Sequence, residues 1–374
     1  MNRHPVNEGA PSDPDARLLF EMVSIASLTG HERPLAERLS RAMHERGMDA
    51  HIDPAGNAVG IVGSPDEKGR SIDIVLLGHM DTVPGDIPVR IEGDTLHGRG
   101  SVDAKGPLAT FVCAASRANI PTGVRLIVIG AVEEEAATSR GALQAIKSFT
   151  PAACVIGEPS GWDGVTLGYK GRLLVEYEER RASAHAAGPG TSVGDDLCRW
   201  WDRVRTRAES ERISERAFER VQATMRRMGT SSDGLYERAT ALGGFRLPPG
   251  VTAGRIEAIC REEAGEHVRL GFTGAEVAHV CDRNNPVARA LTGAIRGEGG
   301  TPHPKHKTGT SDMNVVGPVW GCPISAYGPG DSALDHTPEE RISLREYARA
   351  IRVLTRALES LAAELAGVEA ACAR

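Results

Sequence analysis

Hydrophobic positions in the first 160 residues follow two alternating patterns. Near-continuous apolar runs of strand length predict strands at 57–63, 72–78, 124–132 and 153–158. Apolar positions at helical spacing predict helices within 15–47, with a break at Thr29-Gly30, and at 104–118 and 139–148. Strands that are apolar on both sides and separated by helices are typical of a largely parallel, doubly covered sheet. This region therefore predicts an α/β domain.

The pattern changes after about residue 171. Residues 172–179 alternate apolar and polar positions with period two, as a half-exposed antiparallel strand does. The highly charged stretch from Asp195 to Arg227 carries Arg and Glu at helical spacing, which predicts a solvent-facing helix. The remaining elements of this α+β unit are a strand, a helix and a strand at 239–247, 251–262 and 266–274.

The α/β pattern returns from about residue 285, with a helix, a strand and a helix predicted at 286–297, 323–328 and 343–366. An insertion explains this order better than two consecutive domains, and 374 residues exceed what one hydrophobic core usually organises. We therefore expect an α/β domain with a mixed, mostly parallel sheet from residues 1–171 and 281–374. Residues 172–280 are expected to form an inserted α+β domain.

The composition argues against several classes of function. Aromatic residues make up only 4% of the chain, which disfavours recognition of single-stranded nucleic acid by stacking. A net charge of −6 gives no broad attraction to phosphate or to anionic membranes. No segment resembles a signal peptide or a membrane span, and the seven cysteines are scattered without a Cys-x-x-Cys spacing. We expect a soluble cytoplasmic protein that binds neither nucleic acid nor membrane.

Imidazole and carboxylate side chains follow the predicted strands and begin one of the predicted helices. In open α/β sheets, ligands bind just beyond the carboxyl ends of the strands, so these side chains can meet in one crevice. Two histidines combined with several carboxylates suit zinc or a similar divalent ion. The candidates in chain order are His79, Asp81, Asp103, Glu133 to Glu135, Glu158 and His336.

The chemistry of a two-metal site explains these residue types. Two ions about 3.5–4 Å apart need a carboxylate that can bridge them and further ligands on each ion. A histidine ligand needs its second ring nitrogen fixed, and Asp81 lies two residues from His79 on the same side of an extended chain. A carboxylate beside the metals but not bound to them can take a proton from the attacking water.

Each candidate taken alone has a simpler explanation. Asp103 can cap the helix that follows it, and the segment 337–340 fits a helix start with Thr, Pro and a capping-box Glu, which would make His336 incidental. The run Glu133 to Glu135 can be a solvated loop, and Glu158 can face solvent. Only their joint placement after successive strands favours the metal site.

Several motifs carry a family resemblance. In order along the chain they are His79-x-Asp81, "GRGSVDAKG", "EEEA", "GEPS", "AHAAGP" and His336. They resemble the dinuclear zinc aminoacylase and carboxypeptidase superfamily over nearly the whole chain. Longer phrases are most similar to hydrolases that release lysine or ornithine from an amino-group carrier protein, among them "GAVEEEAATSRGA", "GEPSGWDGVTLGYKGR" and "AYGPGDSALDHTPEE". The resemblance implies a zinc-peptidase-like catalytic domain and a ferredoxin-like lid that also forms a homodimer.

The resemblance also implies roles for the candidates. His79 and Glu158 would bind one metal, Glu135 and His336 the other, and Asp103 would bridge them. Asp81 would orient His79. Glu134 would be the general base, and this choice among the three glutamates rests on the family pattern, because spacing alone leaves it open. The implied cofactors are two Zn²⁺ ions, for which Co²⁺ can substitute.

Three further residues match functional positions of the family, and the first of them lies in its small domain. His185 would reach the active site of the other subunit and donate to the oxyanion, although it can also be a surface-loop histidine. Arg246 and Thr310 would hold the substrate carboxylate, although Arg246 can equally anchor its own strand. Relatives usually carry Asn-x-x-Pro upstream of this arginine, whereas residues 232–234 here are Ser-Asp-Gly.

The expected activity is metal-dependent hydrolysis of an amide in amino-acid biosynthesis. It would free lysine, ornithine or a related diamino acid from the terminal glutamate of an acidic carrier protein. The segment 199–227 holds nine arginines and five acids, so it is a candidate docking face for that carrier, although a solvated helix explains it too. The alternatives are a deacylase of small N-acyl amino acids, such as acetyl-lysine, acetylornithine or succinyl-diaminopimelate, and an inactive metal or amino-acid binding homologue.

Overall fold

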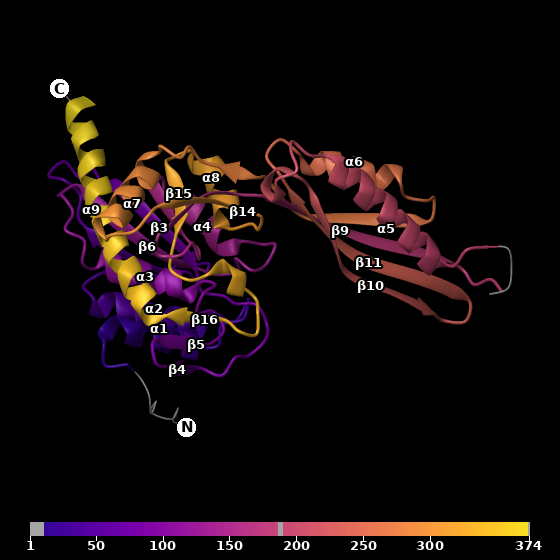
Figure 1. The fold of residues 1–374 in the computed structure, drawn as a ribbon, viewed down its shortest axis with the longest axis horizontal. Helices are drawn as coiled ribbons and strands as arrows, with labels where there is room; N and C mark the ends of the chain where they lie inside the picture. The colour runs from indigo at the N-terminus through magenta and orange to yellow at the C-terminus, as the bar shows by residue number, and fades with distance from the viewer. Residues whose placement is uncertain (1–10, 186–189, 373–374) are drawn as a thin grey trace. The chain divides into compact units, whose positions relative to one another are not determined.

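The computed structural model describes residues 11–185 and 190–372, which belong to two compact units (Figure 1). The first unit comprises Met1–Gly168, Cys281–Lys305 and Ser311–Arg374. The second comprises Tyr169–Val280 and His306–Thr310. The second unit is therefore inserted in the first, and the return of residues 306–310 to it is absent from the boundaries expected from sequence.

The first unit is built on a mixed sheet with the strand order β1-β2-β6-β3-β7-β15-β8. The four strands from β6 to β15 are parallel to one another, and β1, β2 and β8 pair antiparallel with their neighbours. This arrangement confirms the predicted fold class. The bounds are β1 (Asp49–Ile52), β2 (Ala58–Gly63), β3 (Ile72–His79), β6 (Val124–Ala131), β7 (Ala153–Gly157), β8 (Gly164–Tyr169) and β15 (Ile324–Tyr327).

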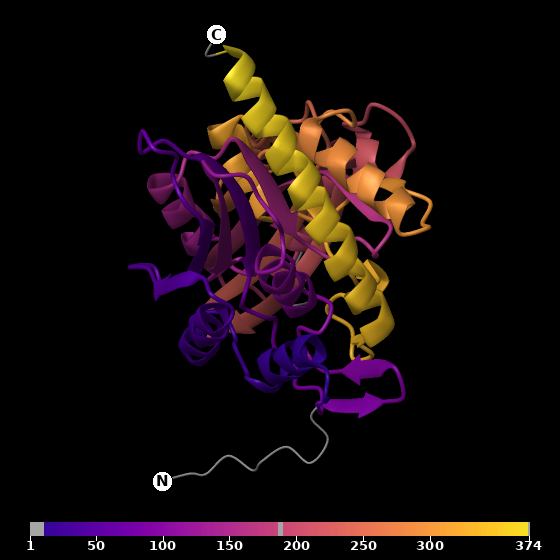
Figure 2. The same ribbon diagram turned by 90° about the vertical axis from the view of Figure 1, so that its left-hand side faces the viewer.

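Helices cover both faces of this sheet because its inner strands are apolar on both sides. Ile74 and Leu76 of β3 join one large core with α1, α2, α3, α7 and α9, while α4 and α8 pack near β6 and β15. Figure 2 shows α9 running diagonally across one face. The bounds are α1 (Pro14–Ser24), α2 (Arg33–Glu45), α3 (Lys105–Ala115), α4 (Arg140–Ser148), α7 (Pro286–Gly297), α8 (Asp312–Trp320) and α9 (Leu344–Cys372). Among the described residues, no helix has the length and apolarity to span a membrane.

A small three-stranded sheet joins distant parts of the first unit. It consists of β4 (Arg90–Glu92), β5 (Thr95–His97) and β16 (Arg341–Ser343), in the order β16-β5-β4. Arg341 pairs with His97, so the segment before β16 lies beside the segment after β5. These strands are not predictable from the sequence, because a run of three residues is too short to show a hydrophobic period.

The second unit has the ferredoxin-like order of two βαβ halves and its own apolar core around Trp200 and Phe245. Its four-stranded antiparallel sheet has the order β10-β11-β9-β12. The bounds are β9 (Gly171–Ala182), α5 (Val193–Ser210), the 3-10 helix η1 (Ala217–Glu219), β10 (Gln222–Ser232), β11 (Tyr236–Leu247), α6 (Ala253–Glu262), β12 (Val268–Glu276) and β13 (His279–Val280). Strand β14 (His303–Lys307) leads to the short return segment.

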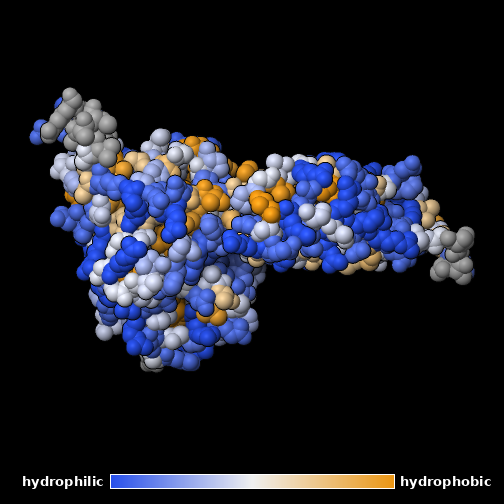
Figure 3. Space-filling model, turned by 45° about the horizontal axis from the view of Figure 1, so that its top comes forward, coloured by the Kyte–Doolittle hydropathy of each residue, from blue (hydrophilic) through white to orange (hydrophobic). Residues whose placement is uncertain are grey.

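The prediction of one helix over 195–227 is wrong. Helix α5 ends at Ser210, and Gln222–Ser232 is the edge strand β10, most of whose residues are exposed. An exposed edge strand can carry Arg226 and Arg227 at no burial cost, so the spacing of charges there does not identify a helix. Figure 3 shows how hydrophilic residues dominate one side of the surface, with apolar residues scattered among them.

Candidate metal centre

Three neighbouring strands of the first unit end at one edge of the sheet. In the parallel register, His79 at the end of β3 is opposite Ala131 of β6, and Gly78 is opposite Gly157 of β7. The residues that follow β6 and β7 therefore lie beside His79. This register explains why side chains about 25 to 80 residues apart in sequence can share one site.

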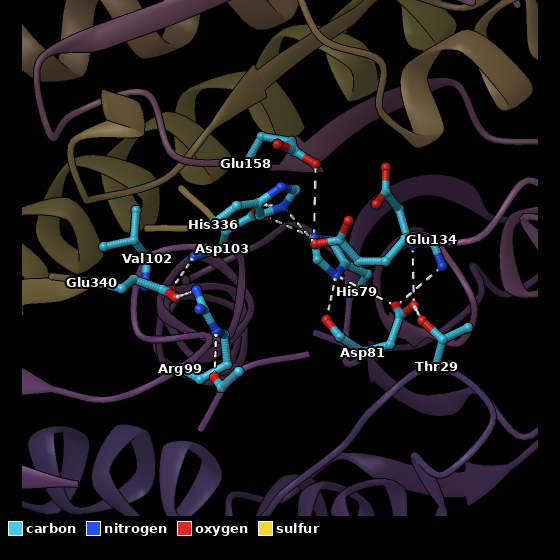
Figure 4. A network of polar contacts seen from close by, with 12 residues as sticks. Thr29, His79, Asp81, Arg99, Val102, Asp103, Glu134, Glu158, His336 and Glu340 are labelled. Atoms are coloured by element: carbon cyan, nitrogen blue, oxygen red, sulfur yellow. Dashed lines mark hydrogen bonds and ion pairs between the residues drawn. The ribbon is translucent and has the colours of Figure 1, made fainter. Parts of the chain in front are cut away.

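Five of the candidate residues form two sets that could each hold a metal ion, and in each set the possible ligand atoms lie within 4.8 Å of one another. Figure 4 labels four of these residues, all except Glu135. The inner set is His79, Asp103 and Glu158, and the outer set is Asp103, Glu135 and His336. Nε2 of His79 is 3.2 Å from Oδ1 of Asp103 and 3.9 Å from Oε1 of Glu158. Nε2 of His336 is 2.9 Å from both Oδ2 of Asp103 and Oε1 of Glu135. The two oxygens of Asp103 thus face different sets, as a bridging carboxylate requires.

The electrostatics of the cluster favour a bound cation. Burial lowers the pKa of His79, but hydrogen bonds to Asp103 and Asp81 outweigh it and hold that pKa well above its ordinary value. Hydrogen bonds to Asp103 and Glu135 raise the pKa of His336 to about 10. Burial would raise the pKa of Asp103, yet the two imidazoles hold it far below its usual range. Carboxylates that stabilise protonated imidazoles this strongly also stabilise a metal cation that binds the imidazoles in place of the added protons.

The donor atoms fit a divalent metal. Ring nitrogen and carboxylate oxygen are the ligands that zinc takes besides thiolate. Nδ1 of His79 donates to the carbonyl oxygen of Asp81 at 3.0 Å, and a carbonyl can only accept. In the neutral ring this bond leaves the lone pair on Nε2, the nitrogen that faces Asp103 and Glu158. His79 is therefore oriented as a metal ligand needs to be.

Asp81 supports two parts of the site through different atoms. Its backbone carbonyl makes the shorter contact with His79, while its carboxylate oxygen Oδ1 is 3.5 Å from Nδ1. The carboxylate accepts hydrogen bonds from the backbone N–H groups of Glu134 and Glu135, each at 3.0 Å, and from the hydroxyl of Thr29 at 2.8 Å. Asp81 thus fixes both His79 and the loop after β6.

The structure separates the three consecutive glutamates. Glu133 adopts a positive φ of 60°, and its carboxylate pairs with Arg140 at 2.8 Å and accepts from Thr138. Glu135 belongs to the outer set. Desolvation raises the pKa of Glu134 well above its ordinary value, and the charge of His79 opposes this shift. Glu133 is thus engaged elsewhere, while Glu134 and Glu135 remain at the site.

The capping explanations for Asp103 and His336 are wrong. Ala104 is the residue before α3, and that helix has no side-chain cap. No helix begins at Pro338, because the chain runs from the 3-10 helix η2 (Ser332–Leu334) through a turn into β16. His336 has a positive φ of 61° in this turn, a conformation that non-glycine residues adopt mainly where surrounding contacts hold it.

Glu340 and Arg99 are supporting residues that the sequence analysis did not find. Glu340 is 1% exposed and accepts the backbone N–H groups of Val102 and Asp103 at 3.0 and 3.1 Å. Arg99 donates to the same carboxylate at 2.7 Å. Glu340 lies more than 200 residues from each of these partners in the sequence, and no local pattern indicates contacts of this kind.

The other three candidates belong to the second unit. Nη1 of Arg246 donates to the hydroxyl of Thr310 at 2.9 Å, so these two residues lie together. His185 is exposed after the end of β9. Asp233 accepts the backbone N–H groups of Leu235 and Tyr236 and thereby closes the β10–β11 turn.

A helix-covered mixed sheet whose carboxyl edge gathers two ligand sets around one shared aspartate is the architecture of a metal-dependent hydrolase. The chain belongs to this class as a member of the peptidase family M20/M25/M40, whose family model matches residues 75–360. This match confirms the resemblance drawn from the motifs.

Two curated proteins with a named activity are similar to this chain over nearly its whole length. The LysW-lysine hydrolase of Deinococcus radiodurans is 51% identical over 93% of this chain and 98% of its own length. The putative LysW-lysine/LysW-ornithine hydrolase of Thermococcus kodakarensis is 40% identical, over 94% of this chain and 93% of its own. Among solved structures, an M20 family metallo-carboxypeptidase from Sulfolobus solfataricus superimposes with a TM-score of 0.76 at 18% identity, covering 94% of this chain and 100% of that one. At that identity the structural likeness shows the fold alone.

Proposed function

We propose that this protein is a dinuclear metal hydrolase that releases lysine, ornithine or a related diamino acid from the terminal glutamate of an amino-group carrier protein. The observation that carries the metal chemistry is the placement of the two oxygens of Asp103 toward two separate ligand sets. The observation that supports the substrate is the 51% identity to a LysW-lysine hydrolase over nearly the whole chain.

In this proposal the inner set holds one ion, the outer set holds the other, and Asp103 contributes to both. Bound there, two zinc or cobalt ions would supply Lewis acidity and lower the pKa of water. Glu134 takes the proton of the attacking water and passes it to the leaving amine. Asp81 keeps the Glu134 backbone and the His79 ring in place through the hydrogen bonds described above.

We assign the second unit to substrate binding and to assembly of a homodimer. Arg246 can bind a substrate carboxylate through its planar guanidinium, and Thr310, which accepts from Arg246, can donate its own hydroxyl hydrogen. His185 of a second subunit would donate to the oxyanion as the amide is attacked. A His185→Ala variant is expected to lose kcat by about 10²-fold or more. An unchanged kcat would remove His185 from the proposal.

An acidic carrier would dock on the arginine-rich segment 199–227. Arg203 and Arg207 of this segment pair with Glu263, so they tie α5 to α6. Arg216 is the better probe, because its side chain is 84% exposed. Arg216→Glu is expected to raise KM for a carrier-bound substrate and to leave KM for a small amide unchanged. Equal effects on the two substrates would place docking elsewhere.

The deciding experiment is an amine-release assay with two families of substrate, each with and without a chelator. One family is a carrier protein loaded with lysine or with ornithine, and the other consists of free N-acyl amino acids such as acetyl-lysine. We expect efficient, chelator-sensitive release from the carrier. Efficient turnover of the small amides alone would replace the proposal with a small-molecule deacylase, and metal binding without turnover of either would indicate an inactive homologue.

A further inference from the structure

Glu340 is a buried carboxylate that touches none of the possible metal-ligand atoms. It lies four residues after His336 and is 1% exposed. A buried carboxylate is costly unless hydrogen bonds and a counter-charge compensate it. Its position therefore needs an explanation in terms of its partners.

The partners of Glu340 all come from the segment that contains the shared ligand. Oε1 accepts the backbone N–H of Val102 at 3.0 Å and that of Asp103 at 3.1 Å. Oε2 accepts Nη1 of Arg99 at 2.7 Å, so a guanidinium supplies the counter-charge (Figure 4). One carboxylate thus binds both the backbone of Asp103 and the arginine four residues before it.

Arg99 also binds the backbone of the loop that contains His336, which gives a second contact between the two segments. Its Nη1 also donates to the carbonyl oxygen of Thr337 at 3.3 Å, and its Nε donates to that of Gly85 at 3.0 Å. The backbone N–H of Gly98 donates to the carbonyl oxygen of Glu340 at 3.3 Å. Beyond this point the β5–β16 ladder continues the pairing. The segments 98–103 and 336–340 are thus joined at both ends, by the contacts of Glu340 and by that between Asp103 and His336.

We propose that Glu340 is a positioning residue that couples Asp103 to the loop of His336 and so sets the geometry of the outer metal site. Within the outer set, the third residue, Glu135, is held independently by Asp81. In the inner set, His79 and Glu158 are held by the ends of β3 and β7. Glu340 therefore acts on two of the three outer residues but on only one of the inner ones. This inference rests on the proposed two-metal centre.

The test measures zinc binding to the metal-free full-length protein, by calorimetry or by competition with a chromophoric chelator. Glu340→Gln keeps the shape of the side chain but loses the charge and one acceptor for Arg99. The outer site is expected to be the weaker, because the side chain of His336 is 50% exposed and that of His79 only 2%. We therefore expect the weaker of the two zinc affinities to fall by about 10- to 100-fold, as it usually does when a residue that supports a metal ligand is changed, and the tighter one to fall by less. Two unchanged affinities, or equal losses at both sites, would overturn the inference.

A second variant guards against misfolding, and a matched control tests specificity. Arg99→Gln removes the counter-charge without touching Glu340 and should weaken the same zinc site. Glu298→Gln is the control, since Glu298 also joins distant segments: it follows the last residue of α7 and pairs with Arg352 of α9 at 2.9 Å. It should leave both affinities unchanged, and a loss of zinc there equal to that of Glu340→Gln would contradict the inference. Binding of fewer than two ions by the unaltered protein would refute the proposed function itself.

Discussion

The inner and outer sets of the candidate metal centre share Asp103 but are built differently. The inner set rests on the ends of two strands, and the side chain of His79 is 2% exposed. The outer set comes from loops, and the side chain of His336 is 50% exposed. Strand ends are fixed by the ladder of the whole sheet, whereas each loop needs its own hydrogen bonds. The inner set is therefore positioned by the sheet itself, whereas the outer set depends on hydrogen bonds from a few side chains.

The largest expected effect comes from the residue that both sets share. Asp103→Asn removes the negative charge that both sets share and replaces one of the two oxygens by an amide nitrogen, which cannot bind a cation. The remaining amide oxygen cannot serve both sets, so both ions should be lost. We expect turnover to fall by about 10⁴-fold, since metal ions contribute several kcal/mol to the transition state. Metal analysis together with an activity assay checks this. Asp73→Asn is the control, because Asp73 pairs with Arg125 at the opposite end of β3. An Asp103→Asn protein that retained two ions would show that the sets do not depend on the shared carboxylate.

The next effect concerns a group that belongs to neither set. Glu134→Gln should lower kcat by about 10²- to 10⁴-fold while two ions stay bound, because it removes a proton acceptor and no ligand. Glu133→Gln is the matched control, since Glu133 pairs with Arg140 away from the ligands. It should change kcat by no more than a few-fold. Loss of an ion from Glu134→Gln would instead assign this residue to the metal sites.

The inner set was easier to predict from the sequence than the outer set. The apolar run of β3 ends in His79, and the register of parallel strands brings the residues after β6 and β7 beside it. Those relationships follow from local patterns and a general rule of α/β sheets. The fold class was predictable for the same reason.

The supports of the outer half could not be predicted. Glu340 and Arg99 are single polar residues whose contact joins segments 241 residues apart, and the strands β5 and β16 that align them have three residues each. The residues at 337–340 even suggested a helix start, because nothing in that local pattern indicates that the side chain of Glu340 is buried. The choice among Glu133, Glu134 and Glu135 also needed the family resemblance. In the structure, the positive φ of Glu133 and the hydrogen bonds from Asp81 distinguish them.

A smaller effect is expected in the affinities with which the two ions are bound. Exposure to solvent weakens the attraction between a cation and its carboxylates, so we expect the outer ion to be held about 1–2 kcal/mol less tightly than the inner one. A chelator titration should then remove the ions in two steps, at concentrations about tenfold apart. Under this assignment, His336→Ala should abolish the step at lower chelator concentration. Removal of both ions in a single step would contradict the difference between the sets.

The smallest effect is expected in the absence of metal, where only the protein contacts differ. His79→Ala removes a buried ring and leaves the carbonyl of Asp81 without its donor, which should lower the free energy of unfolding by about 1–3 kcal/mol. His336→Ala removes a half-exposed ring from ion pairs in contact with water, and such pairs contribute about 1 kcal/mol or less. Chemical denaturation of the two metal-free variants compares these values. A larger loss for His336→Ala would mean that the loops, rather than the strand ends, hold the empty site together.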